Sequence, residues 1–345
     1  MVTTGVEAQT RSPAQRVLDA YDKLENVAVQ VGAINAHRQM LEDLESNVED
    51  IHAFRTWRTE LQRLDDLAYA SLLENSDFLE RMEEYPGAGG LAATILDSTR
   101  DPKLRVRLIN NLQLIAERGR FPMAYFNSLV ARHPIDELNG EVPYITGVST
   151  DSYDVPDEIV EIYSLFAPIA QEMGARRGRD QLIRWLLVDT MAHEVDADSR
   201  ELFLEGVNPV IEEIDNSNTR YVVEVFDEYG FLRIFSDIPS LAELGIAIIH
   251  HGNNVNARRE FLAIIEPLAL QGEFDGQRYA LFYDRLAEIE ERPQRYGTQD
   301  MCVDGVRVPY TLEEPAGDID LRRSYVGLGS IDEYFDLIRS EYGGC

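Results

Sequence analysis

The sequence is poor in cysteine and has no long apolar run, and each shortage excludes a class of protein. The two cysteines, Cys302 and Cys345, are too few for a disulfide framework, so we expect reduced thiols and a cytoplasmic protein. No apolar run approaches the roughly 18–20 residues that a membrane-spanning helix needs. The first 15 residues also lack the apolar region of a signal peptide. The sequence therefore predicts no membrane partner.

Basic residues are scarce as well. The chain has 32 lysines and arginines against 62 aspartates and glutamates, which gives a net charge of −30. Binding to nucleic acid or to an anionic membrane surface depends on cationic side chains, so neither partner is expected. The charge is uneven, at −8 over residues 1–150 and −22 over residues 151–345. With 44% apolar residues, a chain of 345 residues can still bury a core, which excludes disorder throughout.

Apolar residues recur every three or four positions along most of the chain, which is typical of amphipathic helices. Val17, Tyr21, Leu24 and Val27 begin the first such series. The fold class is therefore predicted to be all-α, with a small sheet near residues 303–311 as the exception. Helices are expected over residues 13–44, 48–73, 76–84, 88–97, 102–117, 121–132, 157–174, 178–206, 217–229, 239–251, 255–271, 276–291 and 331–341.

The domain organisation is predicted from where this helical pattern stops. Residues 133–157 contain three prolines and two glycines, so they predict a connection between two helical domains. We expect a disordered tail over 1–12, an N-terminal helical domain over 13–135, a connector over 136–157 and a C-terminal helical domain over 158–345. Proline and glycine return over residues 292–331 and predict a long irregular loop segment near the C-terminus. A homodimer through the N-terminal helices is a further hypothesis.

Two segments carry residue types that bind metals. His193 and Asp196 share a face of a predicted helix, but Ala197 stands where a zinc protease helix has its second histidine. Glu49 and His52 form a Glu-x-x-His pair, whereas a di-iron bundle needs two such pairs. These four residues are secondary metal candidates, and a solvated helix surface is the favoured interpretation of both segments.

The chain shows no nucleotide-binding motif. The glycine-rich stretch 86–90 precedes a predicted helix, but it lacks the Gly-Lys-Ser/Thr ending of a phosphate-binding loop. A tight turn between helices is the favoured interpretation. No cofactor is evident from the sequence.

Two adjacent histidines, His250 and His251, end a predicted apolar helix. Neighbouring helical residues point about 100° apart, so one ring can face the core while the other faces a cleft. The helix dipole stabilises a charged histidine at a helix C-terminus, which suits proton transfer near neutral pH. The alternative is a simple C-terminal cap that Gly252 closes.

A second polar cluster occupies residues 292–299, with the sequence Arg-Pro-Gln-Arg-Tyr-Gly-Thr-Gln. These eight residues carry two amides, a phenol, a hydroxyl and guanidinium groups. Proline and glycine restrict the backbone conformation of the segment. Such a loop can bind a polar ligand in a defined orientation. Alternatively, its side chains satisfy backbone groups of the long loop itself.

Residues 182–340 resemble a bacterial domain family of unknown function that is recognised by a Gln-x-Tyr-Gly-Thr-Gln loop, here Gln294 to Gln299. Asp196 and Arg200 resemble an Asp-Gln-x-x-Arg element of that family, with Ala197 in place of its glutamine. The resemblance implies a helical domain with a clustered polar site. Its further elements are Asp215 with Asn218, Gly230, His250 with His251, Asp284 with Arg285, and Asp318, Arg322, Arg323, Gly327 and Leu328.

These elements predict a polar site in the C-terminal domain. We expect His251 to carry a proton, Asp284 to orient it and Tyr296 to donate a second proton. The expected function is a small-molecule enzyme that uses acid/base chemistry on a polar, anionic or amino-acid-like metabolite, in an accessory biosynthetic role. The alternatives are a non-catalytic interaction or scaffold protein and a metal-dependent helical enzyme. The expected substrate-binding residues are His250, Arg285, Gln294, Thr298, Gln299, Arg322 and Arg323.

Overall fold

The computed structural model describes residues 11–46, 51–99, 101–132, 155–303 and 305–342. Within these residues the protein is mainly α-helical, with fourteen α-helices and one two-stranded sheet, which confirms the predicted fold class. The chain divides into two compact units, Met1–Gly245 and Ile246–Cys345. Most of the predicted tail (1–12) and of the predicted connector (136–157) lies outside the described residues, so both stay predictions.

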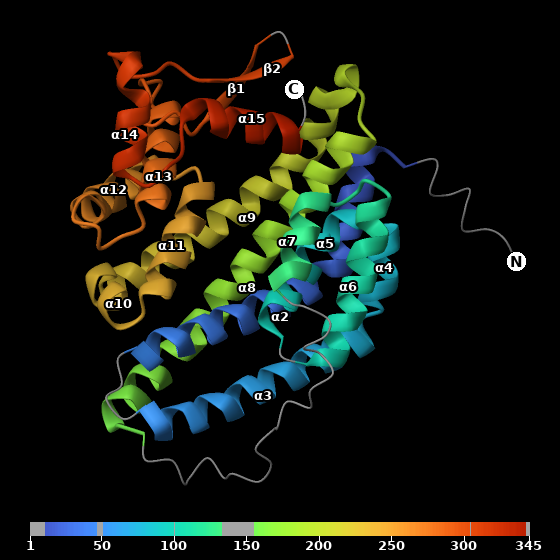
Figure 1. Ribbon diagram of the computed structural model, residues 1–345, viewed down its shortest axis with the longest axis vertical. Helices are drawn as coiled ribbons and strands as arrows, with labels where there is room; N and C mark the ends of the chain where they lie inside the picture. The colour runs from blue at the N-terminus through green and yellow to red at the C-terminus, as the bar shows by residue number, and fades with distance from the viewer. Residues whose placement is uncertain (1–10, 47–50, 100, 133–154, 304, 343–345) are drawn as a thin grey trace, which may run out of the picture. The chain divides into compact units, whose positions relative to one another are not determined.

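The first unit holds most of the helices, which Figure 1 labels in chain order. Helix α6 begins with ordinary capping chemistry, at Pro102 after Asp101, whose carboxylate accepts the backbone N–H groups of Lys103 and Leu104. The helices are α2 (Pro13–Ser46), α3 (Ile51–Asn75), α4 (Phe78–Glu84), α5 (Gly89–Ser98), α6 (Pro102–Glu117), α7 (Met123–Arg132), α8 (Asp157–His193), α9 (Arg200–Tyr229), α10 (Phe231–Asp237) and the first half of α11 (Pro239–His251), with short 3₁₀ turns η1 (Pro86–Ala88) and η4 (Ala197–Ser199).

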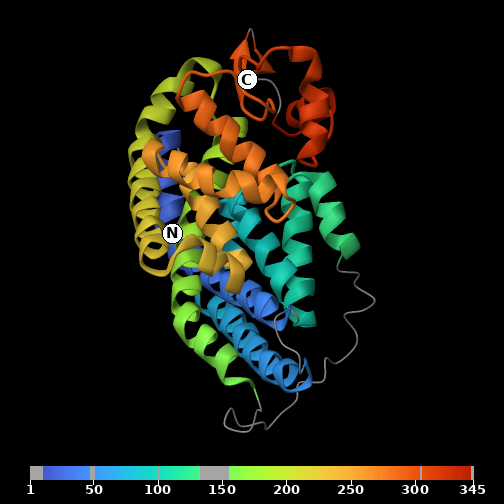
Figure 2. The ribbon, with the colours of Figure 1, turned by 90° about the vertical axis from the view of Figure 1, so that its left-hand side faces the viewer.

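Helices α2 and α8 lie side by side at very close range, as Figures 1 and 2 show. Glycines make this approach possible. A Cβ atom on Gly32 would lie 2.0 Å from the carbonyl oxygen of Gly174, and one on Gly178 would lie 2.0 Å from the carbonyl oxygen of Ala28. Because no real side chain tolerates such distances, the backbones of α2 and α8 are in direct contact. This packing fixes the position of α8, which carries part of the candidate site.

Three expectations about local structure are wrong. Helix α8 runs unbroken through residues 175–177, where a break was predicted, because Gly174 and Gly178 serve helix packing there. The same helix ends at His193, whereas the prediction continued it to residue 206. Asp196 instead caps the 3₁₀ turn η4, so His193 and Asp196 do not share a helix face. Two short helices, α10 (231–237) and α14 (319–325), were not predicted.

The second unit consists of the end of α11 and, within the described residues, seven further elements of regular structure, with a long irregular segment between α13 and α14. The strands pair antiparallel from Asp300 opposite Pro309 to Val303 opposite Val306, which confirms the small sheet predicted near residues 303–311. Asn254 and Asp275 cap α12 and α13 by accepting backbone N–H groups. The elements are α12 (Val255–Leu270), α13 (Gly276–Ile289), β1 (Asp300–Val303), β2 (Val306–Pro309), η5 (Ala316–Asp318), α14 (Ile319–Tyr325) and α15 (Ile331–Tyr342).

One finding concerns the compartment predicted from the sequence. No helix in the described part of the chain combines the length and apolar character that crossing a membrane requires. Reduced thiols and a cytoplasmic location stay predictions.

Candidate functional site

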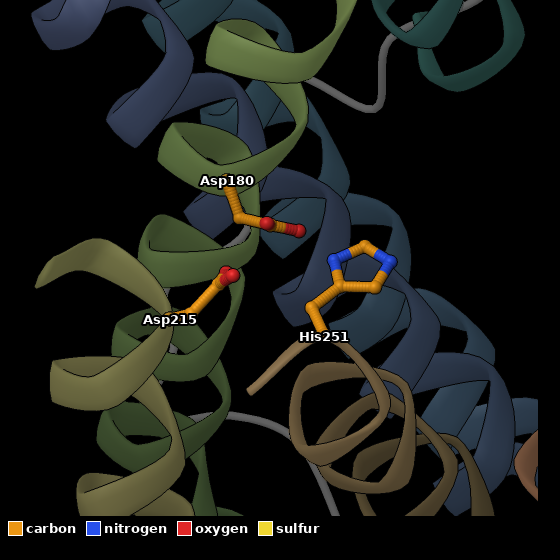
Figure 3. Close-up of side chains that lie close together, drawn as sticks. All are labelled: Asp180, Asp215 and His251. Atoms are coloured by element: carbon orange, nitrogen blue, oxygen red, sulfur yellow. The ribbon is translucent and has the colours of Figure 1, made fainter. Parts of the chain in front are cut away.

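Two aspartates of the first unit meet where α8 packs against α9. Asp180 projects from α8 and Asp215 from α9, and their side chains are only 2% and 7% exposed. Figure 3 shows the two carboxylates close together, each carried by its own helix. Burial of two acidic side chains at one contact is costly unless a counter-charge is present. The packing of α8 and α9 thus creates a carboxyl pair that needs a cation.

Arg184 supplies that cation. Its Nε donates to Oδ1 of Asp180 at 2.7 Å, and its Nη2 donates to both carboxylate oxygens of Asp215 at 2.6 and 2.8 Å. A second arginine, Arg177, donates through Nη1 to the other oxygen of Asp180 at 2.6 Å. The carboxyl pair therefore has its counter-charge within the protein. We refer to Asp180, Asp215 and Arg184 as the carboxyl-pair site.

The electrostatics of the site favour a proton on Asp215. Burial is the main cause that raises the pKa of Asp215 to about 6, and Arg184 acts in the opposite direction. The charge of Asp180 and a hydrogen bond with Asp180 also raise this pKa. Burial lowers the pKa of Arg184, but the attraction to Asp180 and Asp215 raises this pKa by more. Arg184 therefore stays protonated. Asp215 can thus exchange a proton close to neutral pH, with Asp180 beside it to share that proton.

The surface of α9 that carries Asp215 holds two more buried polar residues. Asn218 and Thr219 follow Asp215 by three and four positions, so all three lie on one face of the helix. The side-chain amide of Asn218 donates to the carbonyl oxygen of Arg176 in α8 at 3.2 Å. The hydroxyl of Thr219, a residue only 2% exposed, has no hydrogen-bond partner among the described residues. This face therefore carries an unused buried hydroxyl one turn from Asp215.

Sequence reasoning missed Asp180, although a signal for it was present. The Asp-Gln-x-x-Arg element that we assigned to Asp196 and Arg200 occurs without any substitution at Asp180, Gln181 and Arg184. In the structure these three residues are one connected group, since Gln181 also donates to Asp180 at 3.0 Å. Asp180, Gln181 and Arg184 are thus a second match to this element, and the assignment to Asp196 stays a prediction. Asp215 and Asn218, assigned to the Asp-x-x-Asn element, keep their assignment.

In the second unit, Asp284 on α13 holds the predicted polar loop in place. The residue is fully buried, and its carboxylate accepts the backbone N–H groups of Arg295, Tyr296 and Thr298 at 2.9 to 3.2 Å. It also accepts the hydroxyl of Thr298 at 3.0 Å. Burial raises the pKa of Asp284, while these hydrogen bonds oppose the rise. All four donors belong to the loop, so Asp284 holds the loop closed.

The glutamines of the loop are also used within the loop. Gln294 is fully buried and exchanges two hydrogen bonds with the backbone of Gln299, at 2.9 Å from its Nε2 and 2.8 Å to its Oε1. The amide of Gln299 in turn donates to the hydroxyl of Thr298 at 3.2 Å. These contacts match the alternative interpretation of residues 292–299, in which the side chains satisfy the backbone of their own loop.

The arginines predicted to bind substrate make comparable contacts. Arg322 donates to the carbonyl oxygens of Arg295, Glu313 and Pro315 at 2.8 to 3.2 Å. The buried Arg323 donates to the carbonyl oxygens of Tyr296 and Gly329 at 2.7 and 2.6 Å. Both guanidinium groups thus tie α14 to the loop segment. Arg285 is partly exposed and pairs with Glu288 at 2.5 Å.

Tyr296 lies in a cluster of three tyrosines. Its ring packs edge-to-face against those of Tyr279 and Tyr283, with centroids 5.9 and 5.8 Å away. The hydroxyl of Tyr279 donates to Glu266 at 2.9 Å. Burial raises the pKa of all three phenols, so they are neutral near pH 7. A neutral phenol can donate a hydrogen bond, and the predicted role of Tyr296 as a second proton donor stays a prediction.

The two histidines lie at the end of α11, the helix that crosses from the first unit to the second. The ring of His250 packs near that of Phe282, with centroids 6.2 Å apart. The fully buried Arg258 donates to the carbonyl oxygens of His250 and Gly252, so it caps the helix C-terminus. His251, also labelled in Figure 3, is half-buried. Its proposed part in proton transfer stays a prediction.

Two of the secondary metal candidates, His193 and Asp196, lie in the described part of the chain and make separate contacts. His193 contacts the carbonyl oxygens of Asp189 and Gly119, at 2.8 and 3.2 Å. Asp196 is exposed and accepts the backbone N–H of Ser199. Within the described residues, neither belongs to a group of ligand atoms close enough to hold a metal ion. Glu49 and the side chain of His52 lie outside the described part of the chain.

Comparison with known proteins agrees with the expected family type. The structure is that of a mainly helical protein with a buried carboxyl pair, and the chain belongs to a family of unknown function, DUF6624, whose model matches residues 169–344. The match begins before the predicted start at residue 182, so it includes Asp180. No curated protein and no solved structure matches the chain.

Proposed function

We propose that this protein is an enzyme that transfers a proton to or from a small anionic metabolite, and that the Asp180–Asp215 pair is its acid/base group. The observation that carries the proposal is the buried pair of carboxyl groups bridged by one arginine. Two carboxyl groups in different surroundings divide the roles of acid and base. Here Asp180 has two arginine partners and Asp215 has one, so Asp215 is the group that holds the proton.

The pKa of Asp215 supports proton transfer at physiological pH. A general acid or base works best when its pKa lies close to the working pH. At about 6, the pKa of Asp215 leaves both the protonated and the ionised form populated in a near-neutral solution. A solvated aspartate with its ordinary pKa near 3.9 would be almost wholly ionised there.

The arginines of the site support an anionic substrate. Arg177 and Arg184 are 27% and 30% exposed at their side chains, so a ligand can reach them from solvent. The described hydrogen bonds of Arg184 use Nε and Nη2 and leave Nη1 for a ligand oxygen. Guanidinium groups bind carboxylates strongly because they present parallel N–H donors. We therefore extend the proposal to a substrate that carries a carboxylate, including amino-acid-like compounds.

Several further parts of the proposal come from the sequence. His251 is proposed as a second proton carrier, and a cytoplasmic location and an accessory role in biosynthesis are proposed with it. Assembly as a homodimer through the N-terminal helices is likewise a proposal. The loop of residues 294–299 is proposed to shape the second unit, because its polar groups bond mainly to one another and to Asp284.

Solvent proton exchange tests this proposal without knowledge of the reaction. The full chain is incubated in D₂O with a panel of amino acids, 2-oxo acids and hydroxy acids, and NMR follows deuterium incorporation next to the carboxylate. We expect at least one compound to exchange. Asp215→Asn should slow that exchange by about 100-fold or more, the usual contribution of a general acid or base. The methyl ester of the same compound should lose about 10-fold to 100-fold in kcat/KM, because it no longer pairs with arginine.

A matched control separates chemistry from folding. Glu224→Gln removes an exposed carboxylate from the same helix and should leave exchange unchanged. Circular dichroism checks that both variants fold. If no compound of the panel exchanges, or if Asp215→Asn exchanges as fast as the unaltered protein, the proposal is wrong.

A further inference from the structure

A second set of catalytic residue types lies in the first unit, and all three of its members lie outside the matched family region, residues 169–344. His37 on α2, Asp65 on α3 and Tyr163 on α8 come from three helices. The Nδ1 atom of His37 lies 3.1 and 3.2 Å from the two carboxylate oxygens of Asp65. Its Nε2 atom lies 3.0 Å from the hydroxyl of Tyr163. The three side chains therefore form a continuous hydrogen-bonded chain from a carboxylate to a phenol.

The direction of these hydrogen bonds follows from the groups involved. An ionised carboxylate only accepts, so Nδ1 of His37 carries the proton toward Asp65. Nε2 of a neutral imidazole is then an acceptor, and the hydroxyl of Tyr163 donates to it. This is the arrangement of a nucleophile, a general base and an orienting carboxylate. A merely structural tyrosine would be satisfied equally well by a backbone carbonyl.

The surroundings hold His37 and Asp65 firmly in place. Both residues are buried, with exposures of 5% and 9%. Arg38, next along α2, pairs with Asp66 at 2.9 Å and approaches Asp65 at 3.4 Å, which holds the carboxylate of Asp65 in position. The imidazole has no room to turn, because its two nitrogens are already fixed by partners on α3 and α8.

Tyr163, in contrast, is half-buried and so open to a ligand on one side. Trp57 packs edge-to-face on its ring, with centroids 4.8 Å apart, and Phe54 packs against Trp57 in turn. Burial, with Asp65, raises the pKa of Tyr163, so the phenol is neutral and depends on a neighbouring base for reactivity. The aromatic surroundings favour an uncharged ligand, since the adjacent cation, Arg38, is already paired with two carboxylates.

We propose that Tyr163 is a nucleophilic tyrosine that accepts an acyl group from an uncharged ester, with His37 as its general base and Asp65 as a positioning residue. In the first step the phenol oxygen bonds to the ester carbonyl carbon while the phenol proton passes to Nε2 of His37. The alcohol then leaves and takes that proton, so His37 is neutral again. Water hydrolyses the acyl-tyrosine in a second step, which releases the carboxylic acid and restores the phenol.

The test uses p-nitrophenyl acetate with the full chain and locates acetylated residues by peptide mass spectrometry. We expect Tyr163 to be acetylated at least 100-fold faster than Tyr325, a tyrosine that is 79% exposed and serves as an internal control. His37→Gln should bring the rate at Tyr163 down to that of Tyr325. Asp65→Asn should slow it as well, because an amide no longer fixes the same imidazole tautomer.

The comparison within one molecule keeps the proposal falsifiable even if a variant fails to fold. Acetylation of Tyr163 in the unaltered protein no faster than that of Tyr325 overturns it. An unchanged rate at Tyr163 in a folded His37→Gln protein, judged by circular dichroism, overturns it too. Tyr163→Phe is the blank for the release of p-nitrophenolate from this site.

Discussion

Replacement of Asp284 by alanine should destabilise the second unit more than removal of almost any other single carboxylate. The carboxylate is fully buried and accepts four hydrogen bonds, from the N–H groups of Arg295, Tyr296 and Thr298 and from the hydroxyl of Thr298. Alanine leaves all four donors without their acceptor. Because Tyr296 and Thr298 are themselves 4% exposed, water cannot readily replace it.

The size of the effect follows from the number of donors left behind. A buried donor that loses its partner costs about 1–3 kcal/mol. Two fully buried N–H groups, with smaller contributions from Arg295 and the hydroxyl, give about 4 kcal/mol. Asparagine should cost about half of this, because it keeps one oxygen as an acceptor and removes a buried negative charge. The order alanine, asparagine, aspartate is therefore expected for increasing stability.

Amide hydrogen exchange measures the loss of stability at the loop itself, so the test does not assume that the two units unfold together. A loss of 4 kcal/mol corresponds to amide exchange roughly 10³-fold faster over residues 295–298 when exchange reports the opening equilibrium. Asp332→Asn, an exposed position on α15, is the control and should leave these amides unchanged. Exchange within tenfold of the unaltered protein in Asp284→Ala would refute the view that this carboxylate closes the loop.

Three further predictions follow from the same structure. Gly174→Ala should force α2 and α8 apart, since its Cβ would lie 2.2 Å from the carbonyl oxygen of Gly32, and thermal unfolding should show a fall in Tm well beyond that of an exposed Gly→Ala change. Burial raises the pKa of Asp215 to about 6, so the folded state holds the proton of Asp215 more tightly than the unfolded state does. The stability that this protonated carboxyl group contributes is complete below about pH 4 and is lost as the pH rises through 6. Relative to Asp215→Asn, urea unfolding should show the unaltered protein losing about 3 kcal/mol over that window. His251→Gln should slow proton exchange on any compound found active by about 100-fold, and an unchanged rate would remove His251 from the chemistry.

The fold could be predicted well wherever local signals mark the ends of a helix. The predicted helix over residues 102–117 matches α6 because Asp101 and Pro102 start it in the usual way. The prediction failed at Gly174 and Gly178, which suggest a break when only the local sequence is considered. Their role is to let α8 touch α2, and this contact joins residues more than 140 positions apart. Local rules cannot distinguish a glycine that ends a helix from one that brings two helices together.

The candidate site could be predicted only in part, for a related reason. Residues 284 and 294–299 were correctly expected to lie together, because they are near in sequence and the polar loop follows α13 directly. Their function in the structure could not be predicted, since it depends on which way each hydrogen bond points. Asp180 and Asp215 lie on separate helices, and their meeting depends on where α8 ends and α9 begins. The single helix predicted over residues 178–206 covered the boundary between α8 and α9, so the prediction did not separate the two helices.

The acidity of the chain shows why counting carboxylates does not find the reactive ones. The sequence has 62 acidic residues, and their number alone does not show which of them packing buries. A carboxylate becomes useful for proton transfer near neutral pH when packing removes its water and places another negative charge beside it. Asp215 meets both conditions, because α8 covers it and brings Asp180 with it. The same packing brings Arg184, without which two buried carboxylates would push the helices apart. The acid/base chemistry that we propose at this position would therefore depend on the glycine-mediated contact that holds α8 against α2, so Gly174→Ala should slow the proposed proton exchange as well as lower stability.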